Sequence, residues 1–172
     1  MLKILGAITI IVSCSVIGYS FAKQYNARVY QVRKLRTSLK MLETEIAYSM
    51  NLLPEALRKV GSKLVNPISI LYDYSADTLS KNTGKTMELI WRDALNKLKV
   101  DSSLKDEELE ILADFGSGLG ISDREEQLKN LRFVQEQLKI IEINAEDERQ
   151  RHAKIYQTLG VLIGLALSLI LI

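Results

Sequence analysis

The sequence has few of the residues that build covalent cross-links, metal sites or catalytic centres. Its 172 residues include one cysteine, Cys14, and one histidine, His152. A single cysteine cannot form an internal disulfide, and a single histidine cannot supply a cluster of imidazole ligands for zinc. No serine or cysteine lies in a setting that suggests a nucleophile. We therefore expect no catalytic residue, no metal site and no bound cofactor, and we predict that the protein is not an enzyme.

Residues that interrupt helices or favour sheets are also scarce. The chain has two prolines and 6% aromatic residues, whereas leucine, lysine, glutamate and arginine are frequent. This composition favours helices over strands, so we predict an all-α fold. The net charge of +2 is too balanced for a typical nucleic-acid-binding protein, and we expect no nucleic acid partner.

Charged residues are missing from two blocks near the ends of the chain. The block from Ile4 to Ala22 has no charged residue, and the block from Ile155 to Ile172 is almost wholly apolar. Each is about 18–19 residues long, which as a helix rising about 1.5 Å per residue is enough to cross the hydrocarbon core of a bilayer. We predict transmembrane helices at residues 1–22 and 155–172, with the lipid bilayer as a partner.

The first block allows two other interpretations. Small residues at Ser20-Phe21-Ala22 suit cleavage of a secretory signal, and Ile11-Val12-Ser13-Cys14 looks like the lipobox of a lipoprotein, with Cys14 acylated. The charge pattern favours a membrane anchor, because basic residues and no acid lie between Ala22 and Glu43. Basic residues beside a membrane segment stay in the cytoplasm.

The second block has basic residues beside it on one side only. Arg149, Arg151 and Lys154 precede it, and no charged side chain follows it. We therefore expect an integral membrane protein whose residues 23–154 lie in the cytoplasm, with both termini outside. Gly160 and Gly164, spaced as Gly-x-x-x-Gly, would allow close packing of helices in the membrane.

Apolar residues between the two blocks recur at spacings of three and four, which is typical of helices. The pattern predicts about six helices, at residues 23–50, 54–64, 66–80, 86–98, 104–115 and 122–154. We expect an antiparallel cytoplasmic bundle whose first and last helices continue into the two transmembrane helices. Trp91 is predicted to anchor its core. Towards the membrane the seam of the last helix becomes polar, and we predict a contact between Arg28 and Glu148.

Two features mark the start of the last helix. Ser122-Asp123-Arg124-Glu125 is a capping box, with Ser122 as the N-cap. The glycines from Gly116 to Gly120 are typical of a turn between helices, because glycine suits the left-handed residues at a helix stop. A sharper interpretation is that Gly116, Gly120 and Asp123 form a tight, exposed surface for a partner. The segment from Asn82 to Thr86 ends in Gly-Lys-Thr, as a phosphate-binding loop does. It lacks the earlier glycine and the preceding strand that such a loop needs.

Several motifs, in order, resemble the stage III sporulation protein AB family of endospore-forming bacteria. The resemblance covers the whole chain and includes its apolar C-terminal tail. The motifs are Met-Leu-Lys-Ile-Leu-Gly-Ala at residues 1–7, Val-Tyr-Gln-Val-Arg-Lys-Leu-Arg at 29–36, Leu-Glu-Thr-Glu-Ile-Ala-Tyr at 42–48, Trp-Arg-Asp-Ala-Leu at 91–95 and Phe-Gly-Ser-Gly-Leu-Gly at 115–120. That family is similar to the inner-membrane platform proteins of type II secretion and type IV pilus machines, whose cytoplasmic domains are helical bundles.

The resemblance implies a component of the channel complex between mother cell and forespore, in the mother-cell membrane around the forespore. It implies as partners a secretion-type hexameric ATPase of the same operon and other membrane subunits of the complex. Carried over position by position, the partner-binding candidates are Glu43, Glu45, Gly116, Gly120 and Asp123. Pilus-type platforms usually have two helical domains, so a chain with one domain is expected to form a homodimer or to use another subunit.

Together these observations predict a non-enzymatic membrane scaffold that couples the ATPase to the membrane apparatus. The alternative is a membrane-tethered adaptor or signalling module with an unrelated cytosolic partner.

Overall fold

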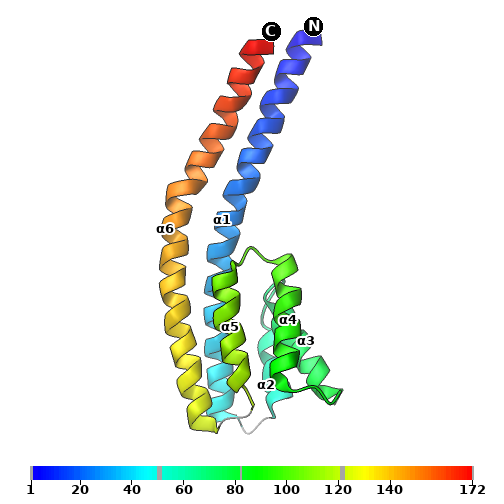
Figure 1. Cartoon of the computed structure of the whole chain (residues 1–172), viewed down its shortest axis with the longest axis vertical. Helices are drawn as coiled ribbons and strands as arrows, with labels where there is room; N and C mark the ends of the chain where they lie inside the picture. The colour runs from blue at the N-terminus through cyan, green and yellow to red at the C-terminus, as the bar shows by residue number, and fades with distance from the viewer. Residues whose placement is uncertain (1, 50–51, 82, 121–122, 172) are drawn as a thin grey trace. The chain divides into compact units, whose positions relative to one another are not determined.

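The chain is helical wherever its structure is described. The computed structural model describes residues 2–49, 52–81, 83–120 and 123–171, and within these ranges it contains α-helices and no strand. The helices are α1 (Leu2–Tyr48), α2 (Leu53–Gly61), α3 (Ser69–Ser80), α4 (Met87–Asp101), α5 (Asp106–Gly118) and α6 (Arg124–Leu171) (Figure 1). The predicted all-α fold and its six helices are confirmed.

Several predicted helix ends differ from the observed ones by two or three residues: α2 ends at Gly61, α3 begins at Ser69, α4 ends at Asp101 and α5 begins at Asp106. Helix α5 does not stop at Phe115 but continues to Gly118, because Gly116 packs inside the fold instead of turning the chain. At the start of α6 the carboxylate oxygen Oδ1 of Asp123 accepts a hydrogen bond of 2.8 Å from the backbone N–H of Glu126. Asp123 therefore caps this helix, whereas the predicted cap, Ser122, lies outside the described residues.

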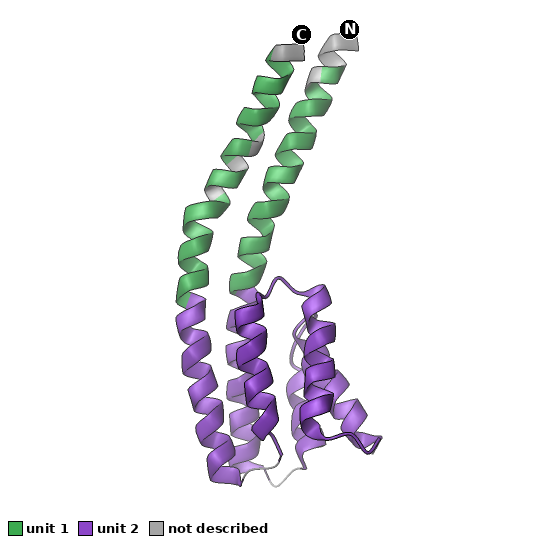
Figure 2. Ribbon diagram, in the orientation of Figure 1, with its two compact units in different colours: residues 1–29, 143–172 green, residues 30–142 purple. Residues whose placement is uncertain are grey.

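The chain divides into two compact units (Figure 2). Unit 1 comprises residues 1–29 and 143–172, and unit 2 comprises residues 30–142. Both long helices, α1 and α6, contribute to both units, whereas α2 to α5 belong to unit 2 alone. The predicted division at residues 22/23 and 154/155 concerns the membrane border and stays a prediction.

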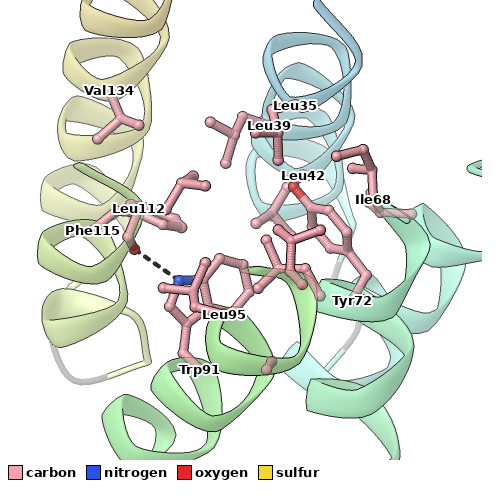
Figure 3. Packing of buried hydrophobic residues seen from close by; sticks show 14 of the residues in the cluster. Leu35, Leu39, Leu42, Ile68, Tyr72, Trp91, Leu95, Leu112, Phe115 and Val134 are labelled. Carbon is pink, nitrogen blue, oxygen red and sulfur yellow. Dashed lines mark hydrogen bonds between the residues drawn. The ribbon is translucent and has the colours of Figure 1, made fainter. Parts of the chain in front are cut away.

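Unit 2 is built around Trp91. The Trp91 side chain is fully buried, and its ring meets the rings of Tyr72 and Phe115 edge-on at centroid distances of 5.9 and 5.7 Å. Its indole Nε1–H donates a 2.8 Å hydrogen bond to the backbone carbonyl of Leu112 (Figure 3). The predicted role of Trp91 as a core anchor is confirmed. Fully buried leucines from the five helices α1 to α5 belong to the same core: Leu35, Leu39, Leu42, Leu57, Leu71, Leu98 and Leu112.

Several polar groups buried in unit 2 have hydrogen-bond partners. The hydroxyl oxygens of Ser38 and Tyr72 lie 2.7 Å apart, and burial raises the pKa of Tyr72 above its ordinary value. The buried carboxylate of Glu108 accepts a 2.8 Å hydrogen bond from the backbone N–H of Lys105 and so caps α5. A buried polar group is costly unless it is paired, so these contacts help to fix how the helices pack.

Unit 1 is a pair of helical segments with small residues inside. Ala22, Gly164 and Ser168 are buried. A Cβ added to Gly164 would lie 2.9 Å from the Cα of Ile11 and 3.3 Å from the Cβ of Cys14. The two helices thus approach closely at Gly164, as small residues allow. Most large apolar side chains of unit 1 face outward instead.

The polar end of unit 1 contains the predicted ion pair. Arg28 Nη1 lies 2.8 Å from Glu148 Oε2, and the Arg28 side chain is only 5% exposed. Next to it the ring of Tyr25 stacks on those of His152 and Tyr156 at centroid distances of 5.8 and 5.9 Å. The predicted contact between Arg28 and Glu148 is confirmed.

The described residues include no helix that combines the length and the apolarity needed to cross a membrane. The transmembrane helices at residues 1–22 and 155–172 stay a prediction.

Candidate partner-binding site

The partner-binding candidate Glu43 joins α1 to α6 within unit 2. Its carboxylate accepts hydrogen bonds from Arg132 Nε at 2.7 Å and from Gln135 Nε2 at 3.1 Å, and the side chain is only 17% exposed. The hydrogen bond from Arg132 is the main reason that the pKa of Glu43 lies below its ordinary value. The carboxylate is therefore ionised at neutral pH and already engaged within the chain.

Glu45 joins α1 to α2 in the same way. One of its carboxylate oxygens accepts hydrogen bonds from Lys59 Nζ at 2.9 Å and from Ser49 Oγ at 2.8 Å. The hydrogen bond from Lys59, followed by that from Ser49, lowers the pKa of Glu45. Both glutamates thus position helices of unit 2, and their part in binding a partner stays a prediction.

Gly116 does not lie on an exposed surface, which corrects the sequence-based interpretation. It is buried in α5, and a Cβ added there would lie 2.1 Å from Trp91 Cδ1. Because no side chain fits beneath the indole ring, the glycine is required for core packing. Gly118, two residues further along α5, has room for a side chain. A Cβ added there would have Asn130 Nδ2 as its nearest neighbour, at 3.4 Å.

Gly120 and Asp123 do lie at the surface, in the segment between α5 and α6. Gly120 is exposed and has φ +83°, a left-handed conformation that glycine adopts readily, so it supplies the predicted helix stop. A Cβ at this position would lie 3.2 Å from Leu53 Cδ2. Asp123 is exposed and caps α6. Of the five candidates, these two are the exposed ones.

Gly120 belongs to a groove that we call the turn groove. Residues from the end of α1, the start of α2 and the start of α6 line it within unit 2. Its lining residues are Ile46, Ser49, Leu52, Leu53, Ala56, Gly120, Arg124 and Gln127. Leu52, on its edge, is 73% exposed, and nearby Tyr48 at the end of α1 is 85% exposed. Large apolar side chains this exposed around a groove are typical of a protein-binding site.

The turn groove is lined by both apolar and polar residues. Ile46, Leu53 and Ala56 can contact an apolar side chain, while Arg124 carries hydrogen-bond donors. Sequence reasoning missed Leu52 and Leu53, because they lie just before Pro54 in the break between the helices predicted at residues 23–50 and 54–64. The signal that could have identified them is a pair of adjacent leucines in a break between helices, where neither leucine continues the apolar spacing of a helix. The described residues contain no group of three or more His, Cys, Asp or Glu arranged to hold a metal.

Comparison with known proteins places this arrangement in a family. The model of the family "Stage III sporulation protein AB" matches residues 3–172. The stage III sporulation protein AB of Bacillus subtilis (strain 168) is 37% identical over 171 residues, which cover 99% of each chain. A solved structure titled stage III sporulation protein AB superposes with a TM-score of 0.68 and 34% identity, covering 73% of this chain and 98% of the solved one.

Proposed function

Because the chain belongs to the stage III sporulation protein AB family, we propose that it is a non-enzymatic scaffold of the membrane complex between mother cell and forespore. In this proposal unit 2 binds the secretion-type hexameric ATPase of the same operon, and other membrane subunits assemble around the chain. The family name records a stage of sporulation and no enzymatic activity. A scaffold with a protein-binding groove fits that description.

The turn groove is the observation that carries the proposal. It is lined by the apolar residues Ile46, Leu53 and Ala56 and by the exposed Leu52 and Gly120. Burying large apolar and aromatic side chains in such a pocket is what contributes most to binding at protein interfaces. The exposed acids Asp123, Glu125 and Glu126 beside it favour a partner with basic residues around an apolar side chain.

We further propose that residues 1–22 and 155–172 anchor the protein in the mother-cell membrane, with unit 2 in the cytoplasm and both termini outside. The uncharged block from Ile4 to Ala22 and the basic residues after it support this arrangement. The outward-facing side chains of unit 1 support it too, because Val16, Ile17 and Leu162 are each more than half exposed. Such a surface is stable in contact with lipid.

The proposed mechanism is mechanical coupling through the two long helices. The turn groove is built from the end of α1 and the start of α6, and the contacts of Glu43 and Glu45 fix both helices to their neighbours in unit 2. A force applied at the groove would therefore act on both helices and reach the membrane through them. Stiff helices suit this role, because α1 contains no proline.

The test is binding of the ATPase to the full chain in detergent, with Leu52→Asp as the groove variant. We expect the variant to weaken binding about tenfold or more, because a charge replaces an apolar contact. The control is Val100→Asp at the end of α4, which is 83% exposed and does not line the groove. It should bind as the original chain does.

Two results would contradict parts of the proposal. If the original chain does not bind the ATPase, the assigned partner is wrong. If it binds and both variants bind equally well, the assigned surface is wrong. Groove-dependent binding of an unrelated cytosolic protein would support the alternative function, a membrane-tethered adaptor.

A further inference from the structure

A second groove lies between α1 and α6 within unit 2, and we call it the basic groove. Its lining residues are Arg33, Arg36, Thr37, Lys40, Met41, Thr44, Gln135, Glu136 and Glu142. The cations Arg33, Arg36 and Lys40 recur on successive turns of α1. At about 1.5 Å per residue they span about 10 Å along the helix. The wall formed by α1 is therefore a row of positive charges, with no acid among its lining residues.

The row is only partly neutralised by α6. One carboxylate, that of Glu142, accepts hydrogen bonds from Arg33 Nε at 2.8 Å and from Arg36 Nη1. Burial alone would raise the pKa of Glu142, but these hydrogen bonds outweigh it and hold the pKa below its ordinary value. Glu136 forms a pair with Lys139 on its own helix. Lys40 forms no salt bridge among the described residues, although its charge helps to lower the pKa of Glu43 on the same helix.

Arg36 also has a donor left over. Its Nε is buried and has no hydrogen-bond partner within the described part of the chain. The side chain as a whole is one-third exposed and lines the basic groove. A buried donor without an acceptor is unfavourable, and an incoming oxygen atom would relieve it. Arginine suits this role because its fork of donors matches a carboxylate.

We propose that the basic groove binds an acidic segment of a partner protein, with carboxylates spaced one helical turn apart facing Arg36 and Lys40. Thr37, Met41 and Thr44 also line the groove, and the flexible side chain of Met41 can adapt to the segment's other side chains. A phosphate-bearing lipid is disfavoured, because Lys40 follows the apolar block at Ala22 by about 27 Å of helix. The proposal is carried by different residues from those of the turn groove and does not depend on the ATPase.

The probe is a fluorescent helical peptide with glutamate at positions i, i+4 and i+7, and its matched control has glutamine at those positions. We expect the full chain in detergent to bind the glutamate peptide and not the glutamine peptide, with affinity that falls as salt rises. Lys40→Glu should weaken this binding about tenfold. The control variant is Lys34→Glu, which makes the same charge change on the same helix. The Lys34 side chain lies over the ring of Tyr30 and does not line the groove.

Three results would overturn the proposal. The first is an equal loss of peptide binding in Lys34→Glu and Lys40→Glu. The second is the absence of any preference for the glutamate peptide over the glutamine peptide. The third is Lys40-dependent binding to phosphatidylglycerol vesicles instead of to the peptide. A second measurement uses membranes of sporulating cells treated with a carbodiimide, which couples an amine to a nearby carboxylate. Amide links from Lys40 to an identified Asp or Glu of another chain, absent at Lys34, would support it. Equal coupling at both lysines would contradict it.

Discussion

The two units differ in the size of the side chains that they bury. Unit 2 buries large side chains, with Trp91, Tyr72 and many leucines in its core, and presents charged residues to its surroundings. Unit 1 buries small residues such as Gly164 and Ser168 and turns its large apolar side chains outward. The same two helices, α1 and α6, contribute to both units, each with a different part of its length.

The difference teaches what stabilises each unit. In water, removing large apolar surfaces from solvent drives packing, so unit 2 needs a thick core from several helices. Two helices alone cannot build such a core. Unit 1 instead relies on close approach at Gly164 and on the Arg28–Glu148 pair. This is the pattern expected where the surroundings are themselves apolar, and it accords with the proposed membrane anchors.

The largest expected effect is on the core of unit 2. Gly116→Ala should lower the free energy of unfolding by about 3 kcal/mol, because the added Cβ would lie 2.1 Å from the Trp91 ring. Urea denaturation followed by circular dichroism measures this change. The control is Gly118→Ala in the same helix, where the nearest atom is 3.4 Å away. It should be neutral or slightly stabilising, because alanine favours helix over glycine by up to about 1 kcal/mol. Equal stability of the two variants would refute the role given to Gly116.

The matching change in unit 1 is Gly164→Ala. Its Cβ would lie 2.9 Å from the Ile11 backbone, so the helices must separate, at a cost of about 2 kcal/mol. Gly6→Ala is the control, because a Cβ there meets nothing within 4 Å. Cross-linking of cysteines engineered on the two helices would report the separation. Equal cross-linking in both variants would mean that Gly164 does not set the spacing.

The ion pair of unit 1 should show a smaller coupling. In a double-mutant cycle with Arg28→Met and Glu148→Gln we expect a coupling energy of about 1 kcal/mol, because the arginine is nearly buried and the glutamate is partly exposed. Thermal unfolding of the four variants measures it. Purely additive effects would show that the contact contributes nothing to stability.

The smallest effect concerns pH and Glu43. Because its pKa is lower in the folded chain than when unfolded, its contribution is complete above about pH 4.5 and is lost as pH falls through the folded pKa. Glu43→Gln should therefore be about 1 kcal/mol less stable at pH 7 and equal to the original chain in strong acid. Urea denaturation across this pH range tests the sign. Glu136→Gln, which removes an exposed pair on α6, should change stability little at any pH. A gap for Glu43→Gln that widened in acid would contradict the prediction.

Periodicity was enough to predict the helices and much of the core. The spacing of Leu35, Leu39 and Leu42 fixed one buried face, and the polar seam of the last helix correctly paired Arg28 with Glu148. The packing role of Gly116 could not be assigned from sequence, because a glycine can either turn the chain or make room for a neighbouring ring. The ring in this case belongs to Trp91, which lies 25 residues earlier. The turn groove could not be predicted for a similar reason, because it joins two stretches that are distant in sequence, residues 46–56 and 120–127.

The position of Trp91 also gives the protein a built-in optical reporter. It is the only tryptophan in the chain, and it lies fully buried in unit 2 with its indole N–H bonded to Leu112. Selective excitation of indole fluorescence therefore follows the environment of unit 2 alone, and unit 1 remains silent. Loosening of the packing around α5 would be visible in the unlabelled protein as a change in emission, even in detergent or native membranes.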